Sequence, residues 1–180
     1  MSTESQRTFH GVPITDKLKI GTPSEREIAM TRVFDAPRQL VFDAFTQPAL
    51  VKRWLYGWDD WSLEVCDLDV RPGGALRYVW RGPQGQQMGM GGVYREIVPP
   101  ERFVHTELFD EDWTGGETLV TTEFEERDGR TTVTMTVRYA SRQARDDALQ
   151  TGMEHGLAVG YDRLEALLAS GAIGNLGRST

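Results

Sequence analysis

After the first two dozen residues, the pattern of hydrophobic and polar positions predicts one strand followed by two short helices. Glu27–Phe34 is rich in β-forming residues and predicts the strand. Asp35 offers an N-cap oxygen for a helix over Pro37–Phe45, which has a proline in its first turn and apolar residues at helical spacing. A second short helix is predicted to begin at Pro48 and to end before Gly57.

Six further strands are predicted after these helices, because runs of β-forming residues alternate with turn signals. Their predicted ranges are Ser62–Val70, Ala75–Arg81, Gln87–Val98, Arg102–Phe109, Thr118–Arg127 and Arg130–Ala140. Asp128-Gly129 is a strong two-residue hairpin signal between the last two strands. Consecutive strands joined by short turns form an antiparallel sheet, and such a sheet typically buries one face.

The last predicted element is a single long helix that begins after Ser141, a residue type that caps helix N-termini. Its apolar stripe has spacings of four and three and consists of Met153, Leu157, Tyr161, Leu164 and Leu168. Gly171 and Gly174 are predicted to end it. The three helices are the available cover for the buried face of the sheet. The chain is therefore predicted to be an α+β domain in which a curved antiparallel sheet surrounds the long C-terminal helix.

Three glycines at a spacing of four lie on one face of this predicted helix. They are Gly152, Gly156 and Gly160. Each costs about 1 kcal/mol relative to alanine inside a helix, so an offsetting role is expected. Close packing against another backbone is one such role, and space for a ligand beside the helix is another. The spacing alone does not separate them.

The chain divides by composition into three predicted segments. Residues 1–24 form a polar N-terminal extension broken by glycines and prolines, with a short strand predicted within Thr15–Ile20. Residues 25–170 are predicted to form the main folded domain, and residues 171–180 a C-terminal tail. A length of 180 residues with 39% hydrophobic residues is typical of one folded domain.

Charge and cysteine content narrow the functional classes. The formal net charge is −7, and the chain has no basic block, so binding to nucleic acid is not expected. One cysteine, Cys66, excludes an internal disulfide and fits a reducing compartment. No apolar run has the roughly 20 residues of a membrane span, and Met1–Gln6 is polar, so no signal peptide is expected. A cytoplasmic location is predicted.

Metal and cofactor motifs are missing from the sequence. The three histidines, His10, His105 and His155, do not have metal-ligand spacing, and there is no Cys-x-x-Cys pair. The sequence also lacks a nucleophile elbow and a phosphate-binding loop. Neither a metal nor a cofactor is predicted.

One strand carries a candidate acid–base pair. His105 and Glu107 alternate on the strand Arg102–Phe109 and share a face with Phe103 and Phe109. Facing a cavity, the pair could do general acid–base work; facing solvent, it would be ordinary surface. Tyr94 is a third catalytic candidate, and no complete catalytic set is identified.

Large aromatic and methionine side chains are the candidates for a ligand pocket, since aromatic residues line pockets and methionine adapts to irregular ligands. The predicted ligand-binding residues are Trp54, Tyr78, Trp80, Met88, Met90, Tyr94, Trp113, Met153 and Leu157. A one-residue error in strand register would turn any strand residue of this set outward.

Several segments together resemble a known family. The matching motifs are Phe34-Asp-Ala-Pro37, Val41-Phe-Asp-Ala-Phe-Thr46 followed by Pro48 and Arg53-Trp54, Asp69-Val-Arg-Pro-Gly-Gly74, Gly92-Val-Tyr-Arg-Glu-Ile-Val-Pro-Pro-Glu-Arg102 and the helix from Gly156 to Leu164. Between about Arg26 and Ala169 the chain resembles the activator-of-heat-shock-protein-90-ATPase homologues, a family of the START-related superfamily. The resemblance implies a helix-grip fold of the Bet v 1/START-like type, with a cavity between the sheet and the long helix.

Three functions follow from these observations. The first is binding of a small apolar or aromatic molecule in the cavity. The second is an enzyme, since the superfamily also contains polyketide cyclases and aromatases; a cyclase-like or hydrolase-like reaction would use His105, Glu107 or Tyr94. The third is a chaperone-interacting module with Trp58 and Trp113 as surface anchors. A monomer and a homodimer are both compatible with the sequence.

Overall fold

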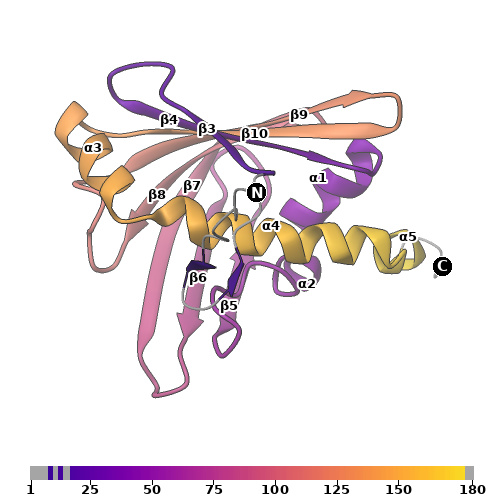
Figure 1. Ribbon diagram of the computed structural model, residues 1–180, viewed down its shortest axis with the longest axis horizontal. Helices are drawn as coiled ribbons and strands as arrows, with labels where there is room; N and C mark the ends of the chain where they lie inside the picture. The colour runs from indigo at the N-terminus through magenta and orange to yellow at the C-terminus, as the bar shows by residue number, and fades with distance from the viewer. Residues whose placement is uncertain (1–7, 10–11, 14–16, 177–180) are drawn as a thin grey trace, which may run out of the picture.

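A curved antiparallel sheet of eight strands forms the frame of the protein (Figure 1). The computed structural model describes residues 8–9, 12–13 and 17–176. In spatial order the strands are β3 (Lys19–Gly21), β4 (Glu27–Phe34), β10 (Arg130–Arg138), β9 (Thr118–Arg127), β8 (Arg102–Phe109), β7 (Gln87–Val98), β6 (Ala75–Arg81) and β5 (Ser62–Leu68). The short strands β1 (Thr8–Phe9) and β2 (Val12–Pro13) pair separately. The first long strand, β4, pairs with the last, β10.

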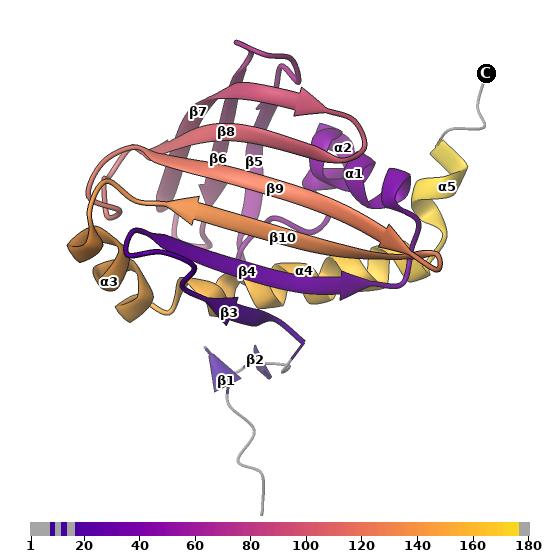
Figure 2. The same cartoon turned by 90° about the horizontal axis from the view of Figure 1, so that it is seen from above.

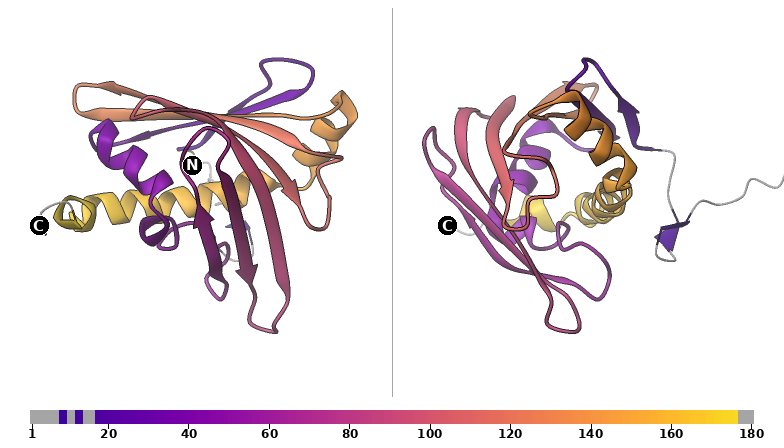
Figure 3. Two further views of the ribbon diagram at one scale, coloured as in Figure 1. Left: turned by 180° about the vertical axis from the view of Figure 1, so that it is seen from behind. Right: turned by 90° about the vertical axis from the view of Figure 1, so that its left-hand side faces the viewer.

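The helices lie on the concave side of the sheet. They are α1 (Arg38–Thr46), α2 (Pro48–Val51), α3 (Arg142–Gln150), α4 (Met153–Ala169) and α5 (Ala172–Leu176). Seen along α4, the sheet curls around the helix (Figure 3, right). From above, α4 runs beside β4 while α1 and α2 lie at the end near α5 (Figure 2). This is the α+β arrangement predicted from the sequence.

The strand predictions hold closely. Four of the six predicted strands have the expected bounds, and the other two end two residues early, at Leu68 and Arg138. The turn at Asp128-Gly129 joins β9 to β10 with positive φ at both residues. This conformation is the one that a tight two-residue hairpin requires.

The predicted long C-terminal helix is present as α4, but the prediction that it begins directly after Ser141 is wrong, because the chain breaks between α3 and α4. Ser141 caps α3 as expected, accepting a hydrogen bond from the Ala144 backbone N–H at 3.1 Å. At the break, Gly152 has φ 71°, a left-handed conformation that glycine adopts without steric penalty. Gly171 likewise ends α4 with φ 72°, whereas Gly174 lies inside α5 and ends nothing.

The start of α1 also differs from the prediction. Pro37, not Asp35, occupies the N-cap position of α1. The Pro37 side chain makes no capping hydrogen bond. Instead, the Glu126 carboxylate on β9 accepts a hydrogen bond from the Arg38 backbone N–H at 2.7 Å. The cap therefore comes from a residue distant in the sequence. The second helix is shorter than predicted and ends at Val51.

Parts of both predicted terminal segments contact the domain. The strand predicted within Thr15–Ile20 begins outside the described residues; β3 is observed at Lys19–Gly21 and pairs with β4. At the other end, Ile173 of α5 is buried in the main core. The edges of the predicted domain thus continue into segments that pack on it.

A buried arginine attaches α4 to the sheet. Arg32 on β4 is 1% exposed. Its guanidinium pairs with Asp162 at 2.6 Å and with Glu165 at 3.2 Å, both on α4. Aromatic contacts also join α4 to the sheet, as where Phe34 of β4 packs edge-on against Tyr161 of α4 at 5.4 Å between ring centres. These contacts fix the position of the helix relative to the sheet.

Candidate functional site

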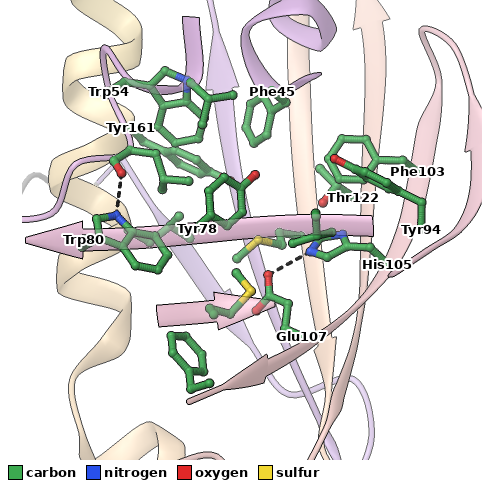
Figure 4. Close-up of a pocket in the computed structure, with 17 residues that line it drawn as sticks. Phe45, Trp54, Tyr78, Trp80, Tyr94, Phe103, His105, Glu107, Thr122 and Tyr161 are labelled. Carbon is green, nitrogen blue, oxygen red and sulfur yellow. Dashed lines mark hydrogen bonds and ion pairs between the residues drawn. The ribbon is translucent and has the colours of Figure 1, made fainter. Parts of the chain in front are cut away.

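A cavity of about 180 Å³ lies between the concave face of the sheet and α4 (Figure 4). Most of its lining is aromatic or aliphatic. Six of the predicted ligand-binding residues lie in that lining: Trp54, Tyr78, Trp80, Met90, Tyr94 and Leu157. The cavity therefore occupies the position expected between sheet and helix.

A second cavity of about 230 Å³ adjoins the first. The two share the lining residues Trp54, Leu55, Trp80, Phe109, Met135 and Leu157. The other three predicted ligand-binding residues, Met88, Trp113 and Met153, line this second cavity. Trp113 is 38% exposed, so the second cavity reaches the surface there. Together the two cavities lead from the surface toward the concave face of the sheet.

The three helix glycines have three different roles. Gly152 forms the left-handed turn between α3 and α4. A Cβ at Gly160 would lie 3.5 Å from the Trp54 carbonyl oxygen, which is ordinary van der Waals contact, so α4 packs against Trp54 there. A Cβ at Gly156 would meet no atom within 4 Å, and Gly156 lines the second cavity. Of the two roles left open by the sequence, packing against a neighbouring element fits Gly160, and open space beside the helix fits Gly156.

The indole N–H groups of the cavity wall are already used by the protein. Trp54 Nε1 donates to the Ala44 carbonyl at 2.9 Å, and Trp80 Nε1 donates to the Leu55 carbonyl at 2.7 Å. These bonds fix both rings. The tryptophans therefore contribute their apolar faces to the cavity.

His105 and Glu107 both line the first cavity rather than the solvent face. The distance between His105 Nε2 and Glu107 Oε1 is 2.8 Å. The His105 side chain is 10% exposed and that of Glu107 is 21% exposed. Figure 4 shows the pair on β8, with the Glu107 carboxylate directed into the space among the labelled aromatic side chains. The alternation in the sequence correctly placed them on one face, and the fold decides which face that is.

The hydrogen bond determines what the pair can offer to a ligand. A carboxylate at Glu107 can only accept, so this contact requires the tautomer of His105 with the proton on Nε2. Nδ1 of His105 is buried and has no hydrogen-bond partner among the described residues. Neither imidazole nitrogen is therefore presented to the cavity. The second oxygen of Glu107, Oε2, is the polar atom of this pair that a ligand can reach.

The tyrosines of the cavity stay protonated. Burial raises the pKa of the Tyr78 hydroxyl well above its ordinary value, and the nearby Tyr94, Cys66 and Glu107 add to the rise. Burial also raises the pKa of Tyr94, with a smaller contribution from Cys66. Tyr161, fully buried, is shifted upward for the same reason. The Tyr94 hydroxyl therefore remains neutral and gives up its proton poorly.

Several aromatic lining residues were not singled out from the sequence. Tyr161 belongs to the predicted helix stripe, and Phe103 and Phe109 share the face of His105, so the pattern carried a signal for these three. Phe45 is held near Trp54, with ring centres 4.9 Å apart. Thr122 reaches the cavity because β9 pairs with β8, which no local pattern reveals.

Reactive and metal-binding groups do not add to this site. Burial raises the pKa of Cys66 to about 11, so its side chain remains a thiol. In the described parts of the chain, no three His, Cys, Asp or Glu side chains gather closely enough to hold a metal ion. No helix within these residues has the length and hydropathy to cross a membrane.

A curved antiparallel sheet around a C-terminal helix, with a lined cavity between them, defines a helix-grip protein of the Bet v 1/START-like class. Residues 35–169 match the family model described as Activator of Hsp90 ATPase homolog 1-like protein. The chain belongs to this family.

Solved structures agree with this assignment. A protein from Rhodobacter sphaeroides is 36% identical and has a TM-score of 0.82, over 86% of this chain and 99% of that one. A protein from Mycobacterium smegmatis is 27% identical, with a TM-score of 0.73 over 87% of this chain and 97% of that one. An AHSA1-like protein from Aeromonas hydrophila shares the fold at 20% identity and a TM-score of 0.64, over 78% and 93%. No protein with a curated description matches the chain.

Proposed function

We propose that this protein binds a small apolar or aromatic molecule in the two adjoining cavities. The observation that carries the proposal is an apolar space, about 180 Å³ plus about 230 Å³, walled by aromatic faces. Apolar cavities of about 150 Å³ stay dry and bind benzene-sized molecules. Sites for small molecules begin at about 300 Å³, which the two cavities together reach.

Two measurements test this proposal. Native mass spectrometry of freshly purified protein is expected to show a bound apolar molecule. The neutral fluorescent probe N-phenyl-1-naphthylamine is expected to bind, and Leu157→Trp, which fills the space shared by the cavities, should weaken its binding at least tenfold. Leu108→Trp is the control, because Leu108 is 44% exposed on the other face of β8.

A second filling variant covers the case in which Leu157→Trp does not fold. Gly156→Phe places its Cβ where no atom lies within 4 Å, so the new ring can enter the second cavity. It should also weaken probe binding. An apo mass together with equal probe affinity in both cavity variants and the Leu108→Trp control would overturn the proposal.

A second candidate function is acid–base catalysis in the same cavity, favoured by the 2.8 Å contact of His105 with Glu107. In this reaction Glu107 would exchange the proton with the substrate, and His105 would position the carboxylate. Once a substrate is identified, Glu107→Gln should abolish its turnover. The same variant should leave binding of the neutral probe N-phenyl-1-naphthylamine unchanged. Equal turnover in this variant would exclude the role.

The remaining expectations from the sequence stay predictions. Trp113 is exposed and available as an anchor for a chaperone, whereas Trp58 is half-buried and packs against Trp61 with ring centres 5.3 Å apart. A pull-down with wild type and Trp113→Ala tests this role. Cytoplasmic location and the choice between monomer and homodimer also stay predictions.

A further inference from the structure

The described lining of the two cavities contains an acidic side chain and no basic one. Among the described residues that line the two cavities, Glu107 is the one Asp, Glu, Lys or Arg side chain. Every other polar side chain there is a hydroxyl, an indole or the His105 imidazole. A ligand in this space therefore meets a carboxylate and no fixed positive charge.

Two arginines that contact α4 or belong to it are engaged elsewhere. Arg32 is committed to Asp162 and Glu165. Arg163 hydrogen-bonds to the Gly57 carbonyl and to Asp59. Neither guanidinium is in the cavity lining. Neutralisation of Glu107 thus depends on His105 and on what the ligand brings.

The carboxylate has capacity for a further hydrogen bond. His105 occupies Oε1, and among the described residues no hydrogen bond is made to Oε2. A carboxylate in apolar surroundings is stabilised by any donor that replaces lost water, and most strongly by a cation. The aromatic rings around it add attraction for a cation placed over their faces. An anion in the same place would gain neither interaction and would be repelled by Glu107.

We infer that the cavity selects small aromatic or alkyl amines, bound as ammonium ions to Glu107 Oε2, and excludes carboxylates such as fatty acids. This inference rests on the proposed binding function and specifies its ligand class. The ammonium donates to Oε2 while His105 Nε2–H holds Oε1. The apolar part of the amine lies against Tyr78, Trp80 and Phe109, which line the same space.

The test compares three probes of nearly one shape by isothermal titration calorimetry at pH 7.5. They are 2-naphthylmethylamine, 2-naphthylmethanol and 2-naphthoate, which are cationic, neutral and anionic. On the wild type, the amine is expected to bind at least tenfold more tightly than the carboxylate, with the alcohol between them. Glu107→Gln should weaken the amine at least tenfold and change the alcohol by less than threefold.

The control variant is Glu125→Gln, which removes the same charge from an exposed position on β9 outside both cavities. It should leave the order of the three affinities unchanged. If Glu107→Gln does not fold, the order of the three probe affinities on the wild type alone tests the inference.

The outcomes separate the two proposals. Absence of binding by all three probes would count against the proposed function. Binding of the carboxylate as tightly as the amine on the wild type would overturn this inference and leave the binding function intact.

Discussion

The ion pairs of Arg32 predict an unequal response to removing one side or the other. The Arg32 side chain is 0% exposed, whereas those of Asp162 and Glu165 are 32% and 38% exposed. If Arg32 is replaced by methionine, both carboxylates can still be hydrated. If both carboxylates are replaced by amides, a buried guanidinium is left without its counter-charges. Removing the partners of a buried charge is the costly direction.

The magnitudes follow from this difference in burial. Stranding a buried charge costs about 3–5 kcal/mol, which is expected for the double variant Asp162→Asn/Glu165→Gln. For Arg32→Met we expect about 1–2 kcal/mol, because the methionine keeps most of the packing and the freed carboxylates are hydrated. In a chain of this length, 1 kcal/mol lowers Tm by about 2–4 °C.

Urea unfolding followed by circular dichroism measures both variants, with Tm from thermal melts as a second readout. Equal m-values would show that the variants change stability and not the mode of unfolding. The reasoning is refuted if Arg32→Met is destabilised as much as the double variant or more. Because Arg32 fixes α4 beside β4, the double variant should also weaken binding of the neutral probe.

Three further predictions concern the glycine pair Gly152 and Gly156, then Cys66, then Glu165. Gly152→Ala should lower the free energy of unfolding by about 1 kcal/mol, because φ is 71° at this position. Gly156→Ala should raise the free energy of unfolding by up to about 1 kcal/mol, because Gly156 lies inside α4 with open space at its Cβ. Urea titrations of both variants check the opposite signs. Cys66 should react slowly with iodoacetamide at pH 8 in the folded protein and quickly in urea, since burial raises its pKa to about 11; equal rates by mass spectrometry would contradict this. The hydrogen bond from Lys17, together with the charge of Arg32, lowers the pKa of Glu165. The stability that Glu165 provides is therefore fully present above its unfolded pKa of about 4.3 and is lost as pH falls through the lower folded pKa, so Glu165→Gln should flatten the stability profile below about pH 4.5.

The cavity residues show where sequence reasoning reaches its limit. Alternation along β8 was enough to place His105 and Glu107 on one face. Whether that face is wet or enclosed depends on how the sheet curves around α4, which involves residues far away in the chain. Two irregularities, after Leu63 in β5 and after Tyr94 in β7, shift the pairing register. Such shifts change which residues point inward, and the local sequence pattern does not predict them.

The β7 strand illustrates this effect. Before the irregularity, the even-numbered Met90 and Tyr94 point into the core. After it, the odd-numbered Ile97 packs against the same core. Strict alternation from Tyr94 would therefore have placed the end of the strand incorrectly. The predictions for Met90 and Tyr94 agree with the cavity because both residues precede the shift.

The sequence by itself determined the elements whose causes are local. Period-two runs separated by turn residues gave the strands, Asp128-Gly129 gave the hairpin, and Ser141 marked a helix start. The tertiary structure decided what depends on distant partners. Glu126 replaced Asp35 as the cap of α1, and sheet curvature enclosed Glu107. A local signal needs only the residues next to it, whereas the cap and the cavity exist only after strands far apart in the chain have paired.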